Sequence, residues 1–294
     1  MALRFTLLFI LSWSALAQDC TPVNLLTEAN SPFEKIPVYD QGQLNICYAY
    51  SAAQILDWYQ MKKGAGKRSV HPAWVALQYA LARHRNKLEI GHPKEAMESV
   101  RDSLNCDFDS VEAALAGRRI ANDVFALRSA LEKPCSPEKR SSVVVPVIER
   151  LNFRRLNTDF AYEEFLRKRL STSPAPLSIA YCANVWKRSE FDGIEVNLRG
   201  ERDLVKKNCD YHESLVVGQK NIGGACHFLV RNTWGTRWNA ANRRHPCVCR
   251  DKLTGKMSDD CRPETHGHDR YDVEGCWLRG ADLARNIGQI TFVK

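Results

Sequence analysis

The sequence lacks several features that would assign it to a common class of protein. It has no internal repeat or low-complexity tract, and after its first residues no segment is apolar enough to enter a membrane. Its formal net charge of +8 is scattered, without the basic stripe interleaved with aromatic residues that nucleic-acid binding requires. We therefore expect no nucleic-acid partner and no membrane span. We interpret the charge as a solvated basic surface, with attraction to anionic cell surfaces or acidic substrates as the alternative.

Residues 1–17 have the composition of a secretory signal peptide. One positive charge precedes an apolar run, and the segment ends in the small-x-small sequence Ala15-Leu16-Ala17. The run of roughly ten apolar residues is too short to span a bilayer as a retained anchor. We expect cleavage before Gln18, a secreted or periplasmic location, and a mature domain over residues 18–294.

Eleven cysteines in an exported chain indicate a disulfide framework. The number is odd, so at least one thiol is expected to be free. If that thiol is Cys47, the other ten cysteines allow up to five bridges, whose pairing the sequence leaves open. Segment 239–276 holds four of these cysteines and three histidines, so it could bind zinc instead. Because it lacks evenly paired cysteine knuckles, we interpret it as a disulfide-stapled insertion without metal.

The hydrophobic pattern changes along the chain from helical to extended. Apolar residues recur at three- and four-residue steps from Cys47, and Pro72 is suited to begin a second helix. Further helices are expected at about 109–117, 122–132 and 160–170, and strands at 177–181, 212–218, 227–232 and 289–293. The sequence therefore predicts an α+β fold, with a helical half over about 32–170 and a β-rich half over about 171–294.

Cys47 is the candidate nucleophile because it opens a predicted helix, where the helix dipole and free backbone N–H groups favour a thiolate. A histidine close to it in space could form a thiolate–imidazolium pair. Attack on an amide carbonyl also creates an oxyanion, which needs hydrogen-bond donors. Gln41, across a glycine-containing loop from Cys47, can supply a side-chain N–H, and the backbone of Cys47 a second. Together these groups describe acyl transfer.

Three segments resemble the papain family of cysteine peptidases. They are QGQLNICYAYS at 41–51, like the segment around that family's nucleophile, YHESLVVG at 211–218, like its histidine strand, and FLVRNTWGTRW at 228–238, like its Asn-Ser-Trp-Gly segment. The resemblance implies a papain-like fold with its active site in the cleft between the two halves. It further implies that His212 is the general base, that Asn232 orients His212, and that Trp234 shields their hydrogen bond. It implies no metal and no organic cofactor.

The sequence also departs from the family. The first cysteine of its Cys-Gly-Ser/Ala-Cys signature is missing, so the usual bridge beside the nucleophile cannot form. His212 and Asn232 lie farther from Cys47 than the roughly 130–150 residues typical of papain-like enzymes, so insertions must be accommodated. Glu213 follows the histidine where the family more often has Ala or Gly. In an alternating strand it should point away from the catalytic face.

The sequence as a whole predicts a secreted, monomeric cysteine endopeptidase that hydrolyses protein or peptide substrates through a Cys47 acyl-enzyme. Only residues 18–46 separate the signal peptide from Cys47, so we expect no control by removal of an N-terminal pro-segment. Two alternatives remain. One is an amidase or transpeptidase acting on cell-wall or isopeptide bonds, and the other is a non-catalytic binding protein on the same fold.

Overall fold

A computed structural model describes residues 20–42, 44–89, 91–118, 122–152, 158–187, 195–196, 202–203, 209–236, 245–261 and 270–294. The signal peptide, residues 239–244 of the expected insertion, and 262–269 lie outside these ranges. The helical elements are η1 (Pro32–Glu34), α1 (Cys47–Lys62), α2 (Pro72–Ala82), α3 (Pro93–Ser103), α4 (Phe108–Leu115), α5 (Val124–Leu131), η2 (Pro137–Lys139), α6 (Asp159–Thr172), η3 (Ala183–Trp186) and α9 (Gly280–Asn286). None of the helices in this part of the chain has both the length and the apolar character that a membrane crossing requires.

The strands form one large antiparallel sheet and two small pairs. The large sheet joins β4 (Ile148–Asn152), β5 (Leu177–Cys182), β8 (Tyr211–Ile222), β9 (Ala225–Arg231), β10 (Cys247–Asp251), β11 (Met257–Cys261), β12 (Tyr271–Arg279) and β13 (Ile287–Val293), in the order β11-β10-β12-β9-β8-β5-β13-β4. A short strand, β1 (Val23–Asn24), also pairs with β8. The small pairs are β2 (Asn105–Cys106) with β3 (Arg140–Ser141), and β6 (Glu195–Val196) with β7 (Arg202–Asp203).

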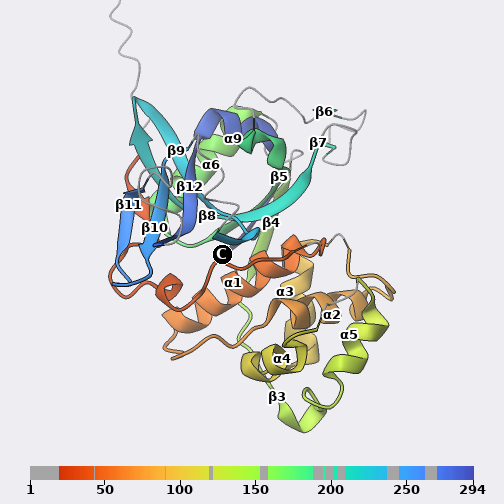
Figure 1. Cartoon of the computed structure of the whole chain (residues 1–294). Coiled ribbons are helices and arrows are strands. Elements are labelled where there is room, and N and C mark those ends of the chain that lie inside the picture. The colour runs from red at the N-terminus through yellow and green to blue at the C-terminus, as the bar shows by residue number, and fades with distance from the viewer. Residues whose placement is uncertain are drawn as a thin grey trace, which may run out of the picture.

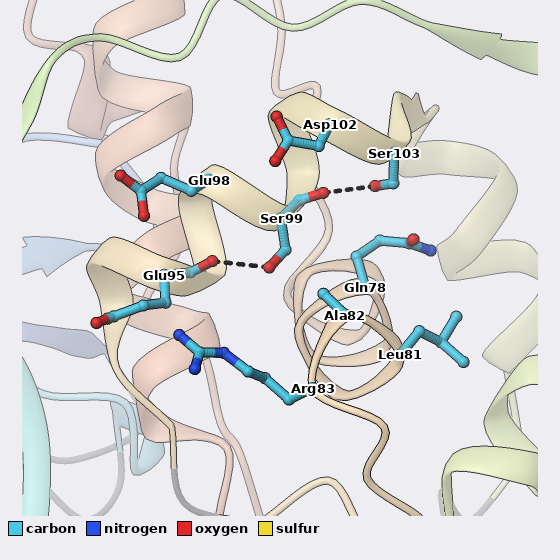
Figure 2. A pocket seen from close by; sticks show the side chains of 9 residues that line it. All are labelled: Gln78, Leu81, Ala82, Arg83, Glu95, Glu98, Ser99, Asp102 and Ser103. Atoms are coloured by element: carbon cyan, nitrogen blue, oxygen red, sulfur yellow. Dashed lines mark hydrogen bonds between the residues drawn. The ribbon is translucent and has the colours of Figure 1, made fainter.

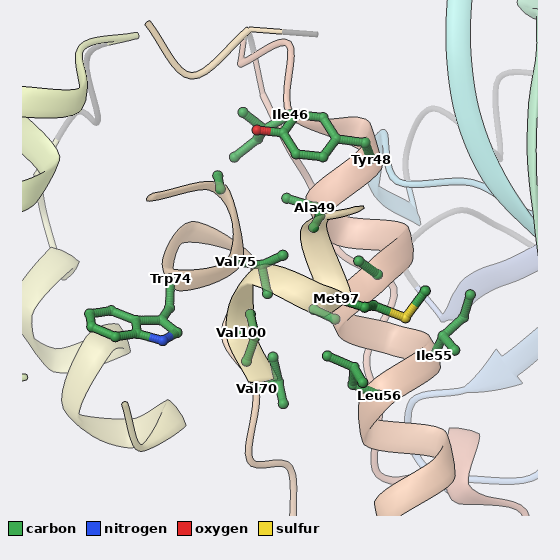
Figure 3. Close-up of a cluster of buried hydrophobic side chains, with 14 of the residues drawn as sticks. Ile46, Tyr48, Ala49, Ile55, Leu56, Val70, Trp74, Val75, Met97 and Val100 are labelled. Atoms are coloured by element: carbon green, nitrogen blue, oxygen red, sulfur yellow. The ribbon is translucent and has the colours of Figure 1, made fainter. Parts of the chain in front are cut away.

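Helices α1 to α5 gather on one side of the molecule, and the sheet with α6 and α9 forms the other (Figure 1). The helical side is held by a core to which α1, α2 and α3 each contribute a buried face. Ile55 and Leu56 of α1, Val75 of α2, and Met97 and Val100 of α3 point into this core (Figure 3). The expected start of the second helix is confirmed, because Pro72 is its first residue and the His71 ring accepts the Ala73 N–H at 3.1 Å.

A second core lies between the sheet and helices α6 and α9, and it moves the division between the two halves. Tyr162, Leu166 and Leu170 of α6 pack with the strands and not with α1 to α5. Strand β4 pairs with β13 of the large sheet. The helical half therefore ends before β4 and not near residue 170, because the apolar face of α6 is covered by the sheet.

Segment 239–276 is stapled by disulfides, as expected, and it also forms strands. Where the structure describes it, the segment supplies three strands, β10, β11 and β12, to the end of the large sheet. Its four cysteines are bridged as Cys247–Cys276 and Cys249–Cys261. Within the described residues, no group of three or more His, Cys, Asp or Glu side chains is placed to hold a metal ion.

Ten cysteines form five disulfides, so the expectation of a disulfide framework is confirmed. Besides the two in segment 239–276, the bridges are Cys20–Cys226, Cys106–Cys135 and Cys182–Cys209. Cys47 is the remaining cysteine, and its thiol is free and buried. Bonds of this kind are typical of proteins that fold in an oxidising compartment, outside the cytosol.

Candidate active site

Two segments far apart in the sequence run antiparallel beside each other at the site. Asp40 forms a β-bridge with Trp234, the Gln41 N–H donates to the Thr233 carbonyl at 2.9 Å, and the Gly235 N–H donates to the Tyr39 carbonyl at 3.0 Å. Gly235 has a φ of +78°, and a β-carbon there would lie 2.9 Å from the Asp40 carboxylate. This pairing brings the loop before Cys47 against the segment that holds Asn232.

Asn232 directly follows β9, and His212 lies near the start of the neighbouring strand β8. The His212 Nε2 atom lies 2.6 Å from Asn232 Oδ1, and both residues are buried. The same oxygen accepts the Thr233 N–H at 2.7 Å and the Ser214 hydroxyl at 3.3 Å. Because a backbone N–H donates to it, this atom must be the amide oxygen, so His212 carries its proton on Nε2. Nδ1 is then the ring atom that can accept a proton.

Aromatic rings enclose His212. The Trp234 ring lies over it, with ring centroids 4.0 Å apart and planes tilted by 33°. Tyr181 of β5, whose hydroxyl is 3.1 Å from the Ser214 hydroxyl, meets the histidine edge-on at 5.9 Å. The Trp234 ring therefore packs on the histidine that is hydrogen-bonded to Asn232.

Cys47 is the first residue of α1, and this helix packs against β8. The Ile46 side chain provides no cap for the helix, so the first backbone N–H groups are left for other acceptors. The backbone N–H groups of Cys47 and Tyr48, at the start of the helix, and of Glu213 on β8 all favour a negative charge on the sulfur. Cys47 is thus brought to the residue that follows His212. Among the hydrogen bonds of the described residues, none joins its thiol to the His212 ring.

Burial acts on Cys47 and His212 in opposite directions. Loss of water raises the pKa of the Cys47 thiol to about 12, with a further contribution from the Glu213 charge. The same loss of water lowers the pKa of His212 to about 3, although the hydrogen bond to Asn232 opposes this. Each charge alone is therefore disfavoured at neutral pH. Burial thus favours the neutral thiol of Cys47 and the neutral ring of His212 in the free protein.

Gln41 lies next to Thr233, the residue after Asn232, with its side-chain amide oriented by two contacts. Its oxygen accepts the Thr233 hydroxyl at 2.7 Å, and one hydrogen of its Nε2 group is donated to the Leu44 carbonyl at 3.0 Å. The second Nε2 hydrogen is not used by either contact. An amide held in this way is preorganised to donate to a charge that develops nearby.

Sequence reasoning did not single out Thr233 and Ser214. Thr233 lies within segment 228–238. Its position between Asn232 and Trp234 is the signal in the sequence that could have identified it. Ser214 lies two residues after His212, so strand alternation places both on the same face. Their hydroxyl groups make further contacts to Gln41 and Asn232, respectively.

Two pockets lined by described residues lie away from these residues, on the helical side. One pocket of about 340 Å³ lies between α2 and α3 and is lined by Arg83 and by the acidic side chains Glu95, Glu98 and Asp102, among others (Figure 2). A second, of about 390 Å³, lies between the end of α2 and α5, next to the exposed Phe125. None of the residues expected at the site lines either pocket.

The architecture is that of the papain-like α+β fold, in which a helical half packs against a β-rich half. Among solved structures, the chain resembles xylellain, a cysteine protease from Xylella fastidiosa, at 13% identity and a TM-score of 0.54, covering 96% of this chain and 88% of the other. It also resembles a structure described in work on the antibody cross-reactivity of the mite allergens Blo t 1 and Der p 1. That likeness has 14% identity, a TM-score of 0.53 and coverage of 97% and 73%. No protein-family model and no curated protein matches the sequence.

Proposed function

We propose that this chain is a cysteine endopeptidase, exported to the periplasm or the cell exterior, that hydrolyses peptide bonds. The observation that carries the proposal is the hydrogen bond of 2.6 Å between His212 and Asn232, which leaves Nδ1 as a base on a strand packed against the helix that Cys47 begins. The free Cys47 thiol, in a chain whose other ten cysteines are bridged, fits the role of nucleophile. The five disulfides support export.

In the proposed mechanism, the Cys47 sulfur attacks the substrate carbonyl carbon while its proton passes to Nδ1 of His212. The carbonyl oxygen becomes an oxyanion, which the Cys47 backbone N–H and the second Nε2 hydrogen of Gln41 stabilise. As the tetrahedral intermediate collapses, the C–N bond breaks and His212 gives its proton to the leaving amine. A thioester remains on Cys47. Water, deprotonated by His212, then attacks the thioester and releases the acid and the free thiol.

Asn232 keeps the histidine in the tautomer that this sequence of steps needs, because its oxygen holds the proton on Nε2. Trp234 covers the bond from water, which strengthens it. Both residues act on His212 and not on the substrate. We therefore propose that they position the base, whereas Cys47, His212 and Gln41 touch the reacting atoms.

The test is hydrolysis of a fluorogenic peptide library between pH 4 and 8 by the mature protein with its disulfides intact, compared with Cys47→Ala. We expect turnover by the first protein and none by the second, with both folded by circular dichroism. Equal hydrolysis by the two proteins would refute the proposal. Absence of hydrolysis together with absence of Cys47 labelling by a peptidyl epoxide would favour the binding-protein alternative. Added amine that diverts the acyl-enzyme to a new amide in preference to water would favour a transpeptidase.

A further inference from the structure

Glu213 follows His212 on β8, and the alternation of that strand determines which side of the sheet it reaches. His212 and Ser214 share the face that carries Asn232. Glu213 lies on the opposite face with Leu215 and Val217, whose side chains join the core on the helical side. The alternation expected from the sequence is present. The opposite face is nevertheless covered by α1, so Glu213 points toward the helix that begins at the proposed nucleophile.

The Glu213 carboxyl group is buried, and only one of its two oxygens has a hydrogen-bond partner. The residue has no exposed surface. One carboxyl oxygen accepts the Tyr211 hydroxyl at 2.5 Å, and the other has no hydrogen-bond partner in the structure. A buried carboxylate without a paired cation is costly. Burial consequently raises the pKa of Glu213 to about 8, with the Tyr211 hydrogen bond opposing the shift.

The cation that acts on Glu213 is paired with another carboxylate. Arg150 of β4 favours ionisation of Glu213, but its guanidinium is bound at 2.7 Å to Glu95 of α3, whose own charge acts against ionisation. The tyrosines Tyr48 of α1 and Tyr211 of β8 stay neutral, because burial raises the pKa of both. The titratable and charged groups that act on Glu213 or share its surroundings are therefore Cys47, Tyr48, Tyr79, Glu95, Arg150 and Tyr211.

Two groups of Glu213 act in opposite directions on the charge of the Cys47 sulfur. Its backbone N–H favours charge on the sulfur, whereas the charge of its carboxylate disfavours it. The first effect is permanent. The effect of the carboxylate exists only when the carboxyl group is ionised. Salt screens it little, because both groups are buried.

We propose that Glu213 is an electrostatic gate on the nucleophile, which lets Cys47 become a thiolate while its carboxyl group is protonated and suppresses the thiolate once it ionises. This proposal rests on the proposed function, because it takes Cys47 as the nucleophile. Glu213 is a positioning residue in this scheme, since it acts through the sulfur and cannot reach a substrate. Such a gate would restrict activity to acidic and neutral pH, where the Glu213 carboxyl group is protonated.

The test compares the wild type with Glu213→Gln, which keeps the size of the side chain and the oxygen that Tyr211 binds. We measure the rate constant for alkylation of Cys47 by iodoacetamide between pH 5 and 10, with the disulfides intact. Alkylation follows the thiolate fraction, which changes about tenfold for each unit in the thiol pKa. We expect equal rates at pH 5 to 6, and a wild type that is about tenfold slower at pH 9. Superimposable profiles from two folded proteins would overturn the proposal.

A second variant keeps the proposal testable if Glu213→Gln does not fold. Tyr211→Phe removes the hydrogen bond that favours ionised Glu213, so the loss of wild-type alkylation should begin at higher pH. A Tyr211→Phe profile identical to that of the wild type would contradict the gate, because a purely structural tyrosine would not move the pH dependence. Peptide hydrolysis is measured separately. Its absence would refute the proposed function while the alkylation profiles still decide on the gate.

Discussion

Substitution of Glu274 should show how much one buried ion pair at the end of β9 contributes to the stability of the protein. Arg231, the residue before Asn232, lies 2.8 Å from Glu274 of β12, and the side chains are 0% and 3% exposed. Arg231 also donates to the Gln54 side chain at 3.1 Å and to the Ile36 carbonyl at 2.5 Å. These contacts keep the guanidinium inside the protein. Glu274→Ala would therefore leave a buried cation without its counter-charge.

Breaking a buried pair by removal of one partner costs about 3–5 kcal/mol, and we expect a loss near the middle of this range for Glu274→Ala. The other partner of Glu274, Arg250, bound at 2.6 Å, should suffer less, because it is 21% exposed and also donates to the Phe33 carbonyl at 3.1 Å. Glu274→Gln keeps an acceptor oxygen but no charge. The loss of unfolding free energy for Glu274→Gln should therefore lie between zero and that for Glu274→Ala.

The assay is urea unfolding at pH 7 with the disulfides intact, followed by tryptophan fluorescence. The matched control is Glu28→Ala, which removes the partner of Lys62 at 2.7 Å from a pair whose side chains are 33% and 39% exposed. An exposed pair of this kind contributes at most about 1 kcal/mol. If Glu274→Ala and Glu28→Ala destabilised the protein equally, the argument that burial decides the contribution would be refuted.

Two further predictions follow from the site. Thr233→Val removes the hydroxyl that fixes the Gln41 amide, and the loss of one hydrogen bond of about 1–1.5 kcal/mol should lower kcat/KM for a peptide about tenfold. Thr233→Ser should restore the activity, and a valine variant with unchanged kcat/KM would contradict the role assigned to the hydroxyl. Glu213→Gln should gain thermal stability over the wild type as pH rises from 4.5 to about 8, because the folded pKa is raised above the unperturbed value of 4.5 and the unfolded chain ionises first. A difference in Tm that stays constant across this range would count against a buried Glu213.

The parts of the fold that the sequence predicted are those with a strong local signal. The helix that begins at Pro72 has a proline at its first position and an apolar body, and β8 and β13 have apolar runs of strand length. Helix α3 was missed because it is mostly polar and buries only a narrow face, which includes Ala96, Met97 and Val100. Strands β10 to β12 are not predicted from the sequence, because cysteines and polar residues interrupt their apolar pattern.

At the site, the sequence motifs linked His212 with Asn232 but did not indicate the groups that surround them. The hydrogen bond between His212 and Asn232 is the one that the resemblance implied. The position of Glu213 relative to His212 also followed from strand alternation. That α1 covers the opposite face could not be read from the strand, because the packing partner of a strand is determined by tertiary structure.

The pairing of residues 39–41 with 233–235 has a consequence for the order in which the protein becomes competent during synthesis. Cys47 leaves the ribosome early. Asn232, which would orient its base, comes 185 positions later, close to Cys226, whose bridge partner Cys20 is 206 residues before it. Contacts of such separation form late in folding, since a long loop must close first. We therefore expect nascent chains and chains that end before residue 233 to carry a thiol but no proteolytic hazard to the cell that makes them.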